Sequence, residues 1–169
     1  MLRRRVLGGE GHIDWFIATF KIVQSSGWVQ ITGSPDLFSK MEIVETGEIL
    51  TTNRPTLPHD GLRGGSVKIK YTFKEKTPVS FMNIFRRCQE LLEADFRGVD
   101  TSKVQSLAGA FYENYWLNRI YFDGSWDSLT DVGSMFSSSA SGIMYYNPKY
   151  DVSKLRSGLV SGWRLEPLS

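Results

Sequence analysis

Alternating apolar and polar residues dominate the first part of the chain. The clearest example is "SVKIKYTFK" (66–74), in which Val, Ile, Tyr and Phe alternate with Ser, Lys and Thr. A period of two places one face of a strand on a core and the other in water. Similar patterns occur at 14–23, 27–31 and 40–50, and "ETGE" within the last predicts a hairpin turn. We expect these strands to form a small antiparallel, β-sandwich-like module over residues 12–76.

The second part of the chain repeats. Phe85, Phe111 and Phe136 each begin a similar block, at spacings of 26 and 25 residues. Each block continues with a short β-prone stretch and a polar return segment, and such a unit buries its apolar positions only by stacking on its neighbours. We therefore expect a mainly β protein with short helices, in which a three-repeat solenoid over residues 79–169 ends in a cap that contains Trp163. The predicted repeat core is Phe85, Cys88, Leu91, Phe111, Leu117, Ile120 and Phe136.

Two short motifs, "DTSKV" (100–104) and "DVSKL" (151–155), occupy corresponding corners of these blocks. Asp, Ser and Thr side chains bond nearby backbone N–H groups and so support tight turns or helix starts. We interpret both motifs as turn-forming elements of the repeat rather than as reactive sites.

The first block resembles the repeat of BspA-like leucine-rich-repeat proteins. The resemblance rests on Phe85, Cys88, Leu91, Asp95, the "DTS" at 100–102 and Val104, and it extends over about residues 81–160. Blocks two and three lack the cysteine. The β module that precedes the repeats also resembles the small β domain found before such repeats in surface proteins. The resemblance implies a leucine-rich-repeat-like solenoid and non-enzymatic recognition or adhesion on exposed surfaces.

Composition narrows the classes of function. A formal charge of +2 does not indicate nucleic-acid binding, and a single cysteine (Cys88) with two histidines argues against a disulfide framework or a transition-metal site. We expect no cofactor. No apolar stretch approaches the roughly 20 residues that span a bilayer, so we expect no membrane insertion. The basic start, "MLRRR", is not followed by an apolar run and does not predict a secretory signal. We expect residues 1–11 to form a flexible basic arm.

Catalysis by paired carboxylates is the least favoured class. Glycosidases need two carboxyl groups that converge on one bond. The available groups are Glu90, Glu93, Asp95, Asp123, Asp127 and Asp131. They recur with the repeat, which is more typical of turns and surfaces, and we expect no catalytic residue.

Aromatic residues and one arginine form the candidate binding surface. If Ile120, Phe122 and Tyr145 face the core, alternation places Arg119, Tyr121 and Tyr146 on the open face of the repeat sheet. Tyr and Arg at such positions suit a protein contact or stacking on a sugar. Tyr115 and Trp126 complete the set of candidates. The alternative is that these aromatic residues pack in small repeat cores.

The combined prediction is a non-enzymatic structural or binding protein. We expect a virion structural or decoration component of a phage of gut bacteria, made in the host cytoplasm, because that setting combines an adhesion-type repeat with the absence of an export signal. The alternative is a bacterial cell-surface adhesin of BspA type, and a glycan-active enzyme is third. The expected partners are other structural proteins of an assembly, or a host-surface protein or glycan. A homo-oligomer or a larger complex is expected, because the open end of a short solenoid needs a cap or a partner.

Overall fold

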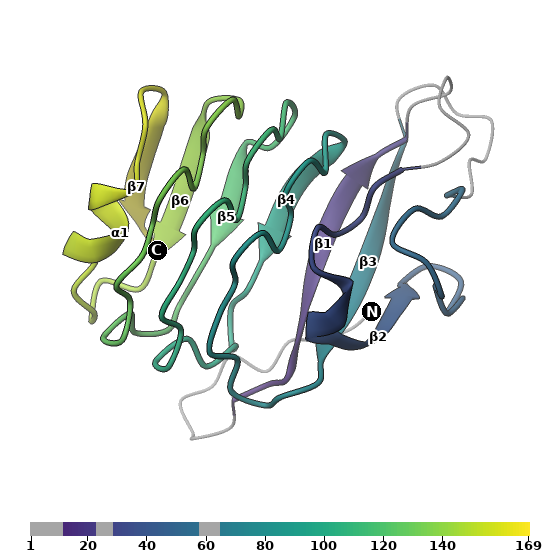
Figure 1. The fold of residues 1–169 in the computed structure, drawn as a ribbon, viewed down its shortest axis with the longest axis horizontal. Coiled ribbons are helices and arrows are strands. Elements are labelled where there is room, and N and C mark those ends of the chain that lie inside the picture. Colours follow the sequence, from purple (N-terminus) through teal and green to yellow (C-terminus); the bar gives the residue numbers. More distant parts are fainter. Residues whose placement is uncertain (1–11, 23–28, 58–64) are drawn as a thin grey trace.

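A mixed β-sheet organises the chain in the computed structural model, which describes residues 12–22, 29–57 and 65–169 (Figure 1). Within these residues the sheet has seven strands in the order β2-β3-β1-β4-β5-β6-β7. The strands are β1 (Trp15–Lys21), β2 (Phe38–Ile43), β3 (Ser66–Phe73), β4 (Leu91–Asp95), β5 (Arg119–Tyr121), β6 (Gly142–Tyr146) and β7 (Trp163–Pro167). A 3-10 turn, η1 (Pro35–Leu37), precedes β2, and one short helix, α1 (Ser153–Ser157), precedes β7. The chain is therefore mainly β, with very little helix. The predicted basic arm at 1–11 lies outside the described residues.

The antiparallel part of the sheet consists of β2, β3 and β1. β1 pairs with β3 from Trp15↔Thr72 to Lys21↔Ser66, and β2 pairs with the other edge of β3. Alternate side chains on β1 and β3 are buried, as the period of two predicts, and they include Phe16, Phe20 and Tyr71. The antiparallel strands are thus confirmed. The described residues show no second sheet packed on them, so the sandwich is confirmed only in its antiparallel strands.

Two predicted strand regions of this part take a different form. Residues 29–31 form no strand, although Val29 and Ile31 donate backbone hydrogen bonds to Pro55 and Asn53. Residues 27 and 28 lie outside the described part of the chain. The predicted hairpin at 40–50 is reduced to the end of β2 and an isolated antiparallel bridge to Ile49. Val29 and Ile31 of the first region and Leu50 of the second nevertheless join the core.

The other four strands run parallel and in register. Glu93, Arg119, Ile143 and Arg164 are aligned across β4, β5, β6 and β7. On the far side of the core, the return segments 81–88, 107–114 and 132–139 also bond to one another, for example from Phe85 N to Ala110 O and from Phe111 N to Met135 O (both 2.9 Å). Left-handed backbone recurs at equivalent positions in all three segments, at Asn83 and Arg87, at Gly109 and Glu113, and at Ser134 and Ser138. We call one strand with its return segment a layer.

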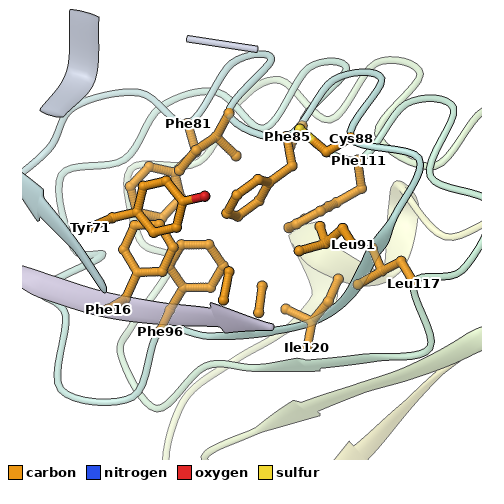
Figure 2. Packing of buried hydrophobic residues seen from close by; sticks show 14 of the residues in the cluster. Phe16, Tyr71, Phe81, Phe85, Cys88, Leu91, Phe96, Phe111, Leu117 and Ile120 are labelled. Carbon is orange, nitrogen blue, oxygen red and sulfur yellow. The ribbon is translucent and has the colours of Figure 1, made fainter. Parts of the chain in front are cut away.

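The core fills the space between the strands and the return segments (Figure 2). In Figure 2, Phe85, Cys88 and Phe111 reach from the return segments toward the side chains of the strands. One column of rings joins Phe85, Phe111, Phe136 and Trp163, with centroid separations of 6.3, 5.4 and 4.1 Å. All seven predicted repeat-core residues are fully buried.

The sheet and the core are continuous across residues 76–79, where the sequence predicts a boundary. β1 pairs with β3 on one side and antiparallel with β4 on the other. The ring of Phe16 on β1 stacks on Phe96, which follows β4, at 4.4 Å.

None of the helices in the described ranges is long and apolar enough to cross a membrane.

Candidate functional site

The open face of β4–β7 is the side of these strands that points away from the core. Ala94, Ile120 and Met144 are aligned across β4, β5 and β6 and are fully buried. Because successive side chains of a strand point to opposite sides, their neighbours lie on the open face. These neighbours form two rows across the strands. Row A is Glu93, Arg119, Ile143 and Arg164, and row B is Asp95, Tyr121, Tyr145 and Glu166.

A stack of three planar groups lies along row B, formed by its two tyrosines and by Arg97, which follows β4. The rings of Tyr121 and Tyr145 are nearly parallel (7°), with centroids 4.8 Å apart. This separation is the ordinary spacing between neighbouring strands, so both rings stand upright on the sheet. The guanidinium of Arg97 covers the other face of Tyr121 at 4.9 Å. The surface therefore presents ring edges and hydroxyl groups, while both faces of Tyr121 are already in contact.

Arginines engage all three carboxylates of the two rows. Arg97 holds Asp95 through two hydrogen bonds of 2.9 and 2.8 Å. Arg119 lies 3.3 Å from Glu93, and Arg164 lies 2.7 Å from Glu166. The two rows therefore present ion pairs on either side of Tyr121 and Tyr145.

Two pKa values on this face follow from the pairing. The hydrogen bond with Asp95 raises the pKa of Arg97, against the opposing effect of burial. Partial burial, and to a lesser extent the charge of Glu93, raises the pKa of Tyr121. Tyr121 therefore carries a neutral hydroxyl at physiological pH, able to donate one hydrogen bond and to accept others.

Arg119 and Tyr121 lie where alternation places them, but Tyr146 does not. The prediction put Tyr145 in the core and Tyr146 on the open face, and the structure shows the reverse. Met144, not Tyr145, is aligned with Ile120, so Tyr145 faces outward. Tyr146 packs partly buried against the core, at the position that Phe122 occupies in the layer before.

Trp126 is also a correction, because it belongs to the core. Only 1% of its surface is exposed, and its ring meets Phe122 edge-on at 4.6 Å. It occupies the same corner of its layer as Thr101, since Val104 and Leu129 donate equivalent turn hydrogen bonds to Thr101 and Trp126. Trp126 is therefore unavailable to a ligand.

Tyr115 is exposed, as a binding residue must be, but it lies beside the open face rather than on it. It sits in the loop before β5 with Trp116, and about half of each side chain is exposed. The ammonium group of Lys21, at the end of β1, lies 3.4 Å from the ring of Trp116. This cation–π contact ties the loop to the antiparallel part of the sheet.

The two Asp motifs form the turns that the sequence predicts. Ser102 N donates to Asp100 (3.0 Å), and Ser153 N donates to Asp151 (2.8 Å). Burial alone raises the pKa of Asp100, but the hydrogen bonds from Ser102 outweigh it and the pKa is lowered. The backbone hydrogen bond from Ser153 lowers the pKa of Asp151. Both carboxylates stay ionised and act as turn supports.

Sequence reasoning missed four residues of this surface besides Tyr145, namely Arg97, Ile143, Arg164 and Glu166. Arg97 follows β4 and covers a tyrosine of the next layer, and β7 itself contributes Arg164 and Glu166. The alternation in "WRLEP" is the signal that indicates β7. Within the described ranges, no cluster of three or more His, Cys, Asp or Glu side chains is arranged to hold a metal ion.

The arrangement offers hydrogen bonds, charges and apolar contact on a rigid surface. Neither a protein-family model, nor a curated protein, nor a solved structure matches the chain.

Proposed function

We propose that residues 79–169 form a short leucine-rich-repeat-like solenoid of BspA type. Its support is the recurrence of one contact from layer to layer. Cys88, Asn114 and Ser139 follow the left-handed residues of successive return segments. Asn114 donates to Phe85 O of the preceding layer (2.9 Å), and Ser139 donates to the equivalent carbonyl of Phe111. A polar side chain that bonds to the preceding layer is the kind of neighbour contact on which a stacked repeat depends, because each repeat is stabilised by those beside it.

We further propose that the protein is a non-enzymatic binding and assembly protein that acts through the open face. The observation that carries this proposal is the upright Tyr121–Tyr145 pair with ion pairs on either side of it. Rigid aromatic side chains and arginines contribute most to protein–protein binding energy, and here the sheet and their neighbours hold them in place. Arginines pair with the acids of both rows. Catalysis by a pair of free carboxylates therefore fits this surface less well than binding does.

The setting that we propose is a phage virion, in which the chain is a structural or decoration component. A bacterial surface adhesin of BspA type is the alternative. Both settings use the same open face, and they differ in where the protein accumulates.

A fractionation experiment tests the setting. An antibody raised against the purified chain is used to follow it through density-gradient fractions of a phage-producing culture of the source organism. We expect the chain to sediment with intact particles. Accumulation on washed cell surfaces supports the adhesin instead, and recovery only from the cytoplasmic fraction contradicts both settings.

A variant pair tests the role of the open face. The double variant Arg119→Ala/Tyr121→Ala is expected to fold but to be lost from the particle or surface fraction. Lys103→Ala, an exposed change on a turn, is the control and is expected to behave as wild type. Equal incorporation of both variants contradicts the use of this face, and turnover of bacterial cell-wall glycans by the purified chain contradicts the non-enzymatic proposal.

A further inference from the structure

The open face of β5–β7 is complementary to itself. It carries three residues of row A (Arg119, Ile143 and Arg164) and three of row B (Tyr121, Tyr145 and Glu166), aligned pair by pair. We propose that this face is a twofold interface with a second copy of the chain. The inference rests on the proposed use of the open face and names its partner.

A twofold axis that runs across the strands, between the two rows, places row A of one copy on row B of the other. Arg164 then faces the carboxylate of the partner's Glu166, and the second copy repeats the contact in the opposite sense. An interface of this kind uses the same patch on both copies. The β7 end of the interface therefore gains two charge pairs from the same two residues of each copy.

The remaining two positions are also matched. Ile143 faces the partner's Tyr145, which brings together the two apolar side chains of the patch. Arg119 faces the hydroxyl of the partner's Tyr121, whose oxygen has lone pairs that accept a hydrogen bond from the guanidinium. All three contact types are therefore favourable in this single arrangement.

Other occupants and other placements fit less well. An axis that lies along row A sets Arg119 and Arg164 each against its own copy, and like charges in contact cost several kcal/mol. A sugar ring needs an open aromatic face, whereas the Tyr121 ring is covered on both sides, by Arg97 and by Tyr145. At β4 the same axis sets Glu93 near the partner's Asp95, so the complementary area ends at β5.

Charge reversal in mixed pairs tests the proposal. Sedimentation equilibrium of the full chain is expected to show a concentration-dependent rise from 19.2 kDa to twice that mass. Arg164→Glu alone and Glu166→Arg alone each set like charges against each other and are expected to weaken the dimer by about tenfold or more. An equimolar mixture of the two variants restores both charge pairs across a heterodimer and is expected to recover the wild-type affinity.

The controls separate this inference from the proposed function. Lys103→Glu reverses an exposed charge on a turn and is expected to leave the dimer unchanged, and circular dichroism reports the folding of every variant. A wild-type chain that stays monomeric at all concentrations overturns the inference, as does a dimer that ignores both reversals or a mixture that fails to recover. The proposed function is judged separately by particle fractionation, so either can fail alone.

Discussion

Replacement of Asn114 measures the contact that joins one layer to the next. Its side chain is fully buried, and its amide donates to Phe85 O at 2.9 Å. Asn114→Ala removes this hydrogen bond, whose net contribution to stability is about 1 kcal/mol. It also leaves a gap where the carboxamide packs. Two effects reduce the loss. Phe85 O keeps a second donor, Cys88 N, and the substitution also removes the carboxamide oxygen of Asn114, which has no hydrogen-bond partner in the described structure.

The net effect of Asn114→Ala is therefore a decrease of about 1–2 kcal/mol in the free energy of unfolding. For a chain of this length it lowers Tm by about 3–8 °C, measured by calorimetry and by denaturant titration. Asn114→Ser should lose less than Asn114→Ala, because Ser139 makes the equivalent bond in the next layer. A serine that is no better than alanine, or an alanine that costs nothing measurable, refutes the equivalence of these positions.

Asn114→Asp extends the test to pH. A buried carboxylate in this place lacks a donor and costs several kcal/mol at neutral pH. Burial raises the folded-state pKa of the introduced acid above its unfolded value, so the penalty is present above the folded-state pKa and shrinks as pH falls. The aspartate variant should therefore approach the alanine variant in stability under mildly acid conditions. Equal penalties at pH 7 and in mild acid contradict this account.

Three further changes test the core, a close approach and a turn. Phe111→Ala empties a fully buried ring site and is expected to cost about 3–5 kcal/mol by denaturant titration; a cost below 1 kcal/mol contradicts the stacked column. Gly142→Ala sets a Cβ 2.6 Å from a backbone oxygen of the preceding layer and is expected to lower the free energy of unfolding by about 1–3 kcal/mol. The control Gly133→Ala, whose Cβ would lie 3.2 Å from a side chain, should be nearly neutral. Equal costs for the two variants rule out the close approach. Because Ser102 lowers the pKa of Asp100, its stabilisation is present above the unfolded pKa of about 3.9 and is lost as pH falls through the lower folded value. Asp100→Asn should therefore flatten the fall in stability between neutral and acid pH, and an unchanged pH profile contradicts this role.

The sequence was most informative where side-chain period and spacing coincide. Strand β3 and the repeated phenylalanines follow directly from alternation and from the 26- and 25-residue spacings, because burial acts on every layer in the same way. The open-face positions of Arg119 and Tyr121 follow from the same rule.

The third layer shows where that reasoning fails. Nine residues separate Phe111 from Ile120, but only eight separate Phe136 from Met144, which fills the same core position. In a strand, a shift of one residue exchanges the two faces, so the nine-residue spacing predicts the wrong faces for Tyr145 and Tyr146. The prediction for Trp126 is wrong because its bulky ring occupies a corner that Thr101 fills in the first layer.

The antiparallel pairing of β1 with β4 has a consequence for how the number of layers can vary. The backbone of β4 is bonded on both edges, by β1 on one side and by β5 on the other. The first layer is therefore closed by a strand that is not a repeat, and the ring column ends at Trp163. A whole block of 25 or 26 residues inserted or deleted between these two ends changes the width of the open face by one strand, about 4.8 Å. Such a change preserves both ends, so variation in the number of layers offers a simple route to a wider or narrower open face.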